Sequence, residues 1–387
     1  MDRRNQRSVK TLAAVIAMIF FFAAILRLPG LTPANYRLYM IGLFNLMILF
    51  SFVCFLWVIV NKWVALFLLL AIVSRGFPLP TEVAAETFEY IVYGIIWYCV
   101  VFFTARHVPD YYLDALCVIA LANTMALIVQ HLPIRSWYVG VPSGLMSNPN
   151  ETSTCLAMCL PACFRPGRTW FIPVVLTGLV LSKSFGGVLA ASFGLIFFGY
   201  MQGGIVITTT LVLAGLVGFY LFIDKPATVE RLEPWQRALE LYPQRWLMGC
   251  GLGHWKVAFV ELAKAGQFPQ GYVRLHNTFI QGMMEMGIGF AVIVVGYLVD
   301  TIRRFNRGDV LPAMALVAII VCSSVNSMFR MNAINAGIAV MWLGVLEASL
   351  RGTVIEMPER YVPEPIMAWT RKKLNNLKGA RKCLTTK

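Results

Sequence analysis

Long apolar runs separated by short polar stretches dominate this chain. Within the runs the apolar residues are continuous rather than alternating with a period of two, which argues against the strands of a β-barrel. A helix needs roughly 20 apolar residues to cross a bilayer, so the chain has room for about 12 such helices. Lipid offers no hydrogen-bond partner to an open backbone. The pattern therefore predicts an all-α fold, a polytopic membrane bundle of about 12 transmembrane helices.

The polar stretches divide the chain into four regions. Residues 1–223 hold the first nine predicted helices, 224–275 form one large loop between helices 9 and 10, 276–350 hold the last three helices, and 351–387 form a basic tail. Within the loop we predict a helix over 234–242 with Pro234 in its first turn. The predicted spans are 11–29, 38–60, 63–78, 86–106, 111–131, 151–164, 169–183, 185–201, 204–223, 277–301, 311–329 and 334–350.

Composition agrees with a membrane protein and changes the interpretation of the charge. Hydrophobic residues make up 58% of the chain and charged residues 13%, whereas a soluble domain carries roughly 25% charged residues. A net charge of +14 would suggest nucleic acid in a soluble protein. Here basic residues at helix ends are better explained by the anionic lipids of the cytoplasmic leaflet. We therefore expect membrane lipids as partners and no nucleic acid.

The distribution of Lys and Arg predicts the orientation. With the N-terminus in the cytoplasm, most of the 33 basic residues fall in inside segments, and few fall in the short outside ones. Both ends are then cytoplasmic and the large loop is external. The first apolar run follows four basic residues, is long enough to span and lacks a convincing cleavage site, so we expect it to be a retained helix.

Three cysteines share one face of a predicted span. Cys155, Cys159 and Cys163 recur every four residues, a spacing that could hold a metal. No histidine or carboxylate joins them, and small side chains are favoured where membrane helices pack. We expect packing there, and no metal or cofactor.

Candidate chemistry gathers in the external loop. Arg231, Arg237 and Arg274 lie there or at its edge, with fewer acidic residues among them. The guanidinium fork pairs two phosphate oxygens at once, so this surplus suits a phosphate or pyrophosphate ligand. Contact with lipid headgroups is the alternative explanation.

His276 stands where the loop re-enters the membrane as a helix. The start of a helix has free N–H groups that favour an anion, and a histidine there can act as a general base. Arg274, two residues earlier, can hold the anion. Glu285 lies in the first turns of the same predicted span, where it could orient the histidine or an arginine, or form a structural ion pair. An interfacial histidine without a role is the alternative.

The glycine-rich turn Gly249-Cys250-Gly251-Leu252-Gly253 could cradle a phosphate. No strand–loop–helix nucleotide unit surrounds it, so a nucleotide site is not expected.

Several motifs occur together in the order typical of one family. Arg231 precedes Trp235 and Arg237, the glycine-rich turn follows, and His276-Asn277 then starts a span that carries Glu285 and Gly287. Earlier, Ser147-Asn148-Pro149-Asn150 precedes a span. Over residues 145–350 the chain resembles the O-antigen ligase and O-antigen polymerase family. One departure is Phe185, where the family often has an arginine, and Lys183 is close enough to supply the charge.

The resemblance implies metal-independent glycosyl transfer on the periplasmic side of a bacterial inner membrane. The donor would be a glycan on undecaprenyl pyrophosphate, and the acceptor a hydroxyl of lipid A–core, of another glycan or of a protein. Carried over by position, His276 would be catalytic, and Arg231, Arg274 and Lys183 would bind the pyrophosphate. The supporting residues would be Glu285, Asn277, Trp235, Arg237 and Asn150.

Two other functions stay open at this point. A repeat-unit polymerase would use the same donor and a different acceptor. A transporter of lipid-linked sugars belongs to another class and should carry charges near the midplane on broken, repeated helices. Because the charged residues gather in one external loop, the sequence favours an enzyme.

Overall fold

The computed structural model describes the central and C-terminal parts of the chain. The described residues are Trp63, Leu66, Leu70, 101–102, 105–132, 141–146, 148–201, 226–244, 246–251, 264–266, 275–305, 310–325 and 333–350.

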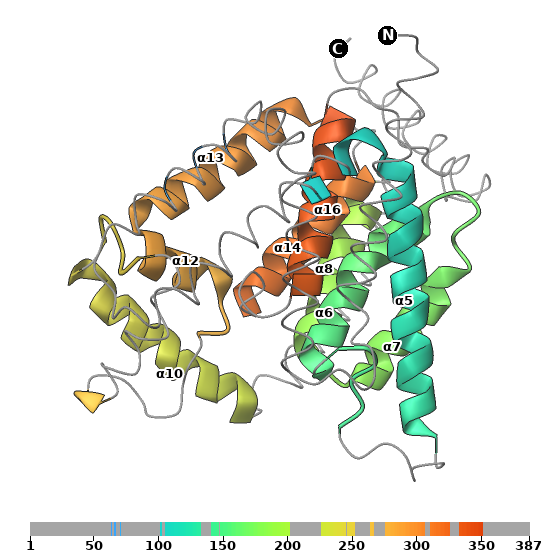
Figure 1. The fold of residues 1–387 in the computed structure, drawn as a ribbon, viewed down its shortest axis with the longest axis horizontal. Helices are drawn as coiled ribbons and strands as arrows, with labels where there is room; N and C mark the ends of the chain where they lie inside the picture. The colour runs from blue at the N-terminus through green and yellow to red at the C-terminus, as the bar shows by residue number, and fades with distance from the viewer. Residues whose placement is uncertain are drawn as a thin grey trace, which may run out of the picture.

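Among these residues every regular element is a helix, which confirms the all-α prediction for this part of the chain (Figure 1). The helices are α5 (Pro109–His131), α6 (Pro149–Cys159), η2 (Leu160–Phe164), α7 (Phe171–Ser182), α8 (Phe185–Met201), α10 (Pro226–Leu241), η3 (Tyr242–Gln244), α12 (Thr278–Met286), α13 (Ile288–Arg304), α14 (Val310–Val325) and α16 (Ala333–Leu350).

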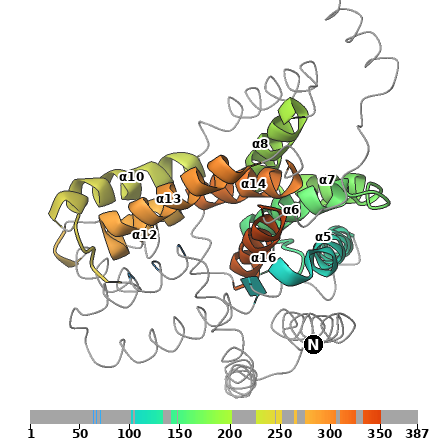
Figure 2. The same cartoon turned by 90° about the horizontal axis from the view of Figure 1, so that it is seen from above.

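Helix α6 is the centre of the main bundle. It packs against α5, α7, α8, α14 and α16, and every residue from Thr152 to Cys163 is buried. Trp342 on α16, 1% exposed, donates a 2.7 Å hydrogen bond from its indole nitrogen to the carbonyl oxygen of Met158. Helices α10, α12 and α13 extend from one side of this bundle in both views (Figure 1, Figure 2).

Small residues let the helices of the bundle approach closely. A side chain at Gly187 of α8 would overlap the backbone of Ser153, and one at Gly178 of α7 would overlap the Thr124 side chain. Cys155, Cys159 and Cys163 are fully buried with free thiols, as expected of small residues in a helix interface. Among the described residues, no group of three His, Cys, Asp or Glu side chains could hold a metal ion.

The predicted spans are matched in part. Helix α5 has 23 residues and a mean hydropathy of 2.0, long and apolar enough to cross a membrane. Helices α7, α8, α14 and most of α16 are apolar but shorter, and they lie close to the predicted 169–183, 185–201, 311–329 and 334–350. Spans 11–29, 38–60 and 204–223, and most of 63–78 and 86–106, lie outside the described residues. The number of about 12 spans therefore stays a prediction.

The predicted span 277–301 is wrong as a single helix. Gly287, at φ 66° and ψ −159°, separates α12 from α13. The nine residues of α12 rise only about 13 Å and cannot cross a bilayer. The two helices meet at an angle (Figure 1).

The helix predicted over 234–242 is longer than expected. It extends over Pro226–Leu241, so Pro234 lies inside α10 rather than in its first turn. Proline lacks an N–H, so this position donates no backbone hydrogen bond within the helix, although its carbonyl oxygen can still accept one. The helix forms nonetheless, because it packs against α12.

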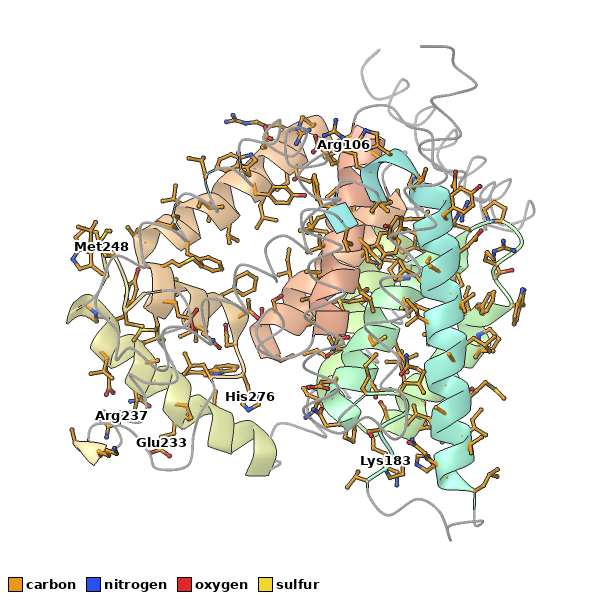
Figure 3. The ribbon with its side chains drawn as sticks, viewed as in Figure 1. Arg106, Lys183, Glu233, Arg237, Met248 and His276 are labelled. Atoms are coloured by element: carbon orange, nitrogen blue, oxygen red, sulfur yellow. The ribbon has the colours of Figure 1, made fainter. Side chains whose placement is uncertain are left out.

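Charged residues from distant segments meet at one end of the bundle. Arg165 pairs with Asp110 (2.7 Å) and Asp114 (3.1 Å). Both aspartates lie in the first turns of α5, a few residues after Arg106 in the sequence. Arg304 pairs with Asp300 (3.0 Å) and Glu347 (3.3 Å). Arg106 lies at one end of the molecule, while Lys183 and His276 lie towards the other (Figure 3).

Candidate functional site

Helices α10 and α12 pack together around a small apolar cluster. Four of the described residues are buried in this cluster: Ala238 of α10, Met284 of α12, Cys250 of the glycine-rich turn, and Leu275, which directly precedes His276. The partly buried Trp235 ring packs against them. The Trp235 indole N–H donates a hydrogen bond to the carbonyl oxygen of Leu275. This contact joins residues 40 positions apart and fixes the backbone immediately before His276.

His276 has an unusual backbone conformation. Its φ is 48°, and within the described part of the chain only Lys183 among the non-glycine residues shares a positive φ. The left-handed region costs a residue with a Cβ roughly 1–2 kcal/mol. Such residues persist where their neighbours hold them and are common at functional sites. The side chain is half-exposed and lies below α12, beside the N-terminal half of α10 (Figure 3).

Asn277 caps α12. Its side-chain oxygen accepts hydrogen bonds of 3.0 Å from the N–H groups of Phe279 and Ile280. We expected this helix start to present free N–H groups to an anion, and the cap corrects that expectation because it already occupies these two donors. An anion beside His276 therefore cannot use the N–H groups of Phe279 and Ile280.

Glu285 is buried in the last turn of α12. It is 4% exposed, and one carboxylate oxygen accepts a 3.1 Å hydrogen bond from the Gln281 amide. Seven helical positions separate it from Thr278, the first residue of α12, an axial rise of about 10 Å. Glu285 thus lies towards the far end of α12 from the histidine, rather than in the first turns of a span.

The glycine-rich turn caps the C-terminal end of α12. The N–H groups of Cys250 and Gly251 each donate a 2.8 Å hydrogen bond, to the carbonyls of Met284 and Glu285 respectively. These two donors are engaged, and the turn lies at the end of α12 away from His276, so Cys250 and Gly251 do not offer their N–H groups to a phosphate.

The same turn is held to α10 by Tyr242, which follows directly on that helix. The Tyr242 hydroxyl donates to the carbonyl of Trp246 (3.3 Å). Partial burial raises the pKa of this hydroxyl, which keeps it protonated and able to donate.

A second polar region lies where α6 and α8 begin. Asn148 caps α6 by accepting from the Glu151 N–H (3.0 Å), and the Ser184 hydroxyl donates to the Asn150 side chain (2.7 Å). Two short motifs of the resemblance, 34 residues apart, therefore touch. Lys183 is exposed beside this contact, in a left-handed conformation (φ 52°) at the end of α7.

Of the three arginines predicted to bind the ligand or support the site, the structure describes the side chain of Arg237 only. Arg237 pairs with Glu240 at 2.9 Å, and it lies two residues from Trp235, hence on the opposite side of α10. The backbone of Arg231 lies one turn before Trp235, on the same side of the helix. Its side chain, and the whole of Arg274, lie outside the described part.

Two polar residues of α5 were not predicted. The Gln130 side chain accepts 2.8 Å hydrogen bonds from the N–H groups of Ser143 and Gly144. The Asn123 side chain accepts one of 3.2 Å from the N–H of Leu145. Together they hold the segment 141–146 against the bundle. An amide side chain inside a long apolar run was the available signal, because such groups are costly in lipid unless they have a partner.

Replacing Lys183 tests the second polar region. Lys183→Ala is expected to raise the KM for a pyrophosphate-linked donor about tenfold, the effect of losing roughly 1.4 kcal/mol of binding, and Lys183→Arg should restore most of it. Initial rates of glycosyl transfer against donor concentration would measure this. Lys264→Ala is the matched control, because Lys264 is exposed and carries the same charge. Equal changes in both alanine variants would mean that Lys183 acts only as general positive charge.

No protein-family model matches this chain. No curated protein matches it either. The family resemblance therefore rests on the motif residues alone.

Proposed function

We propose that this chain is a membrane glycosyltransferase of the O-antigen ligase type. It transfers a glycan from undecaprenyl pyrophosphate to an acceptor hydroxyl, that of lipid A–core, on the periplasmic face of a bacterial inner membrane. The observation that carries the proposal is the backbone of His276. It is held in the left-handed region between the Trp235 contact and the Asn277 cap, and it lies well away from Arg106 (Figure 3).

The reaction forms one bond and breaks one. The acceptor oxygen attacks the anomeric carbon of the donor sugar while the bond from that carbon to the pyrophosphate oxygen breaks. His276 takes the proton of the hydroxyl, a contribution typically worth about 10²–10⁴-fold in rate. Pyrophosphate is a good leaving group, so the protein mainly positions the acceptor and stabilises the departing charge. Arg231, Arg274 and Lys183 are the cations proposed to do so.

The position of the ion pairs relative to His276 supports a periplasmic site. Arg106, Arg165 and Arg304 belong to segments in which the distribution of basic residues predicts a cytoplasmic location. They share one end of the molecule, and His276 and Lys183 lie towards the other (Figure 3). The termini, by the same rule, are cytoplasmic.

A transporter of lipid-linked sugars is the alternative from another class. The interruption at Gly287, with the buried polar pair Gln281 and Glu285 beside it, resembles the broken helices of transporters. A transporter moves its substrate across the bilayer without forming a bond, so the two functions differ in their product.

A reconstituted assay tests the proposal. The full chain in lipid nanodiscs would receive an undecaprenyl-pyrophosphate glycan and lipid A–core, with a chelator present and no nucleotide. We expect a glycosylated lipid A–core and free undecaprenyl pyrophosphate. A lengthened lipid-linked glycan would instead identify a repeat-unit polymerase. If no new glycosidic bond forms and the donor crosses the bilayer of proteoliposomes, the chain is a transporter and the enzymatic proposal is wrong.

A further inference from the structure

The hydrogen bond from Trp235 ends on the carbonyl oxygen of Leu275. That carbonyl belongs to the same peptide plane as the N–H of His276. The φ of His276 is the rotation about the bond between this plane and its own Cα. By holding the Leu275 carbonyl, the indole fixes the peptide plane on the N-terminal side of His276. This restrains the φ of His276, which sets the direction of the imidazole.

The other side of His276 is restrained as well. Asn277 is extended (φ −148°, ψ 110°) and its side chain is tied to the first turn of α12. Leu275, 1% exposed, cannot move without opening the cluster formed with Ala238, Cys250 and Met284. His276 is thus a half-exposed residue between two anchored ones. A left-handed φ at a residue with a Cβ needs such support on both sides.

We infer that Trp235 is a positioning residue for His276, acting through the Leu275 carbonyl. Helix α10 thereby sets where the imidazole stands relative to the acceptor hydroxyl. The inference rests on the proposed function only in assigning the proton transfer to His276. The restraint itself is a property of the α10–α12 packing and can be measured without activity.

Two replacements separate the indole N–H from the bulk of the ring. Trp235→Phe removes the donor and part of the ring. Benzothienylalanine in place of Trp235 keeps the ring shape and substitutes sulfur for the N–H, so the apolar cluster stays filled even if the phenylalanine variant folds poorly. Trp246→Phe is the matched control, because the Trp246 side chain is 52% exposed in the neighbouring turn.

The first readout is kinetic. A misplacement of about 1 Å in a catalytic group can cost roughly 100-fold in rate, so we expect both Trp235 variants to lower kcat for glycosyl transfer at least about tenfold. The KM for the donor should change less than about twofold, because the indole is bonded to the backbone rather than to phosphate. Trp246→Phe should keep the native kcat.

The second readout does not need the reaction. Diethyl pyrocarbonate acylates exposed imidazoles, and mass spectrometry can follow His276 and His131 separately in the same molecules. We expect the ratio of the two acylation rates to change severalfold in both Trp235 variants and to stay constant in Trp246→Phe. General loosening of the fold would raise both rates together and leave the ratio unchanged, which would overturn the inference.

The two readouts keep this inference and the proposed function apart. If the native chain shows no glycosyl transfer but the acylation ratio changes in the Trp235 variants, the positioning of His276 stands and the proposed function is wrong. If the native chain is active and both Trp235 variants keep native kcat and a native acylation ratio, the proposed function stands and the positioning role is wrong.

Discussion

His276→Ala is expected to abolish glycosyl transfer while the protein remains folded in the membrane. Removing a general base typically costs about 10²–10⁴-fold in rate. The imidazole is half-exposed, and alanine like histidine carries a single Cβ at this left-handed φ, so we expect stability to change by only about 1 kcal/mol. Single-turnover transfer with the reconstituted variant, and its thermal unfolding in detergent, would measure the two effects.

His131→Ala is the matched control. His131 ends α5, is half-exposed, and its ring nitrogen lies 2.9 Å from the carbonyl oxygen of Leu127, so it differs from His276 in having no place in the α10–α12 unit. We expect it to keep the native rate. Loss of transfer in His131→Ala with a native rate in His276→Ala would show that the wrong histidine has been assigned. Native rates in both would leave charge stabilisation as the source of catalysis.

Gly287→Ala is expected to have the largest effect on stability. Its φ of 66° with ψ of −159° is a conformation that is essentially confined to glycine, and forcing it on alanine costs about 1–3 kcal/mol. An added Cβ would also overlap the carbonyl of Leu247 and approach the nitrogen of Met248. Both are backbone atoms and cannot rotate away. Retreat of that turn would stretch the 2.7 Å hydrogen bond from Ile288 to the Trp246 carbonyl, adding about 1 kcal/mol.

Gly266→Ala separates the two causes. Gly266 also has a φ of 70°, but none of the described residues lies within 4 Å of the position of its Cβ. It should lose only the backbone contribution, about 1 kcal/mol, whereas Gly287→Ala should lose about 3 kcal/mol or more and, with the turn displaced, most of its transfer activity. Thermal unfolding of both variants in the same detergent gives the comparison. Equal losses would mean that the contact between the turn and α12 does not hold the helix break in place.

The helix break also explains why the candidate site has two parts. Because α12 is separated from α13, it can lie against α10 as well as α14, and His276 lies at the end of α12 nearer the bundle (Figure 3). The Asn150–Ser184 contact and Lys183 belong to the bundle itself, at the junction of α6, α7 and α8. We propose that the donor, with its charged pyrophosphate and extended glycan, contacts both parts of the site. The Lys183 variants test the part in the bundle, and the His276 variant tests the part at the start of α12.

Several features of this protein follow from the sequence alone. The apolar runs predicted α5, α7, α8, α14 and α16 to within a few residues at most of their ends, because a helix buried in lipid or in other helices must be apolar along its whole length. The positions of the basic residues indicated which segments share an end, since charges gather where helices leave the apolar layer. Polar and glycine motifs predicted the segments around Asn150, Trp235 and His276 as the candidate functional ones, and that assignment stays a prediction.

Only the tertiary structure decided how those segments meet. The apolar pattern continues through Met286, Ile288 and Phe290, so the glycine at 287 permits a break but the pattern alone does not predict one. The break exists because the turn 246–251 occupies the space beside it. Cys250 and Gly251 of the glycine motif cap one end of α12, and Asn277 caps the opposite end. The bond from Trp235 to Leu275 joins residues 40 positions apart. Periodicity reports which face of a helix is buried, whereas a hydrogen bond between two helices depends on their relative position, which packing alone determines.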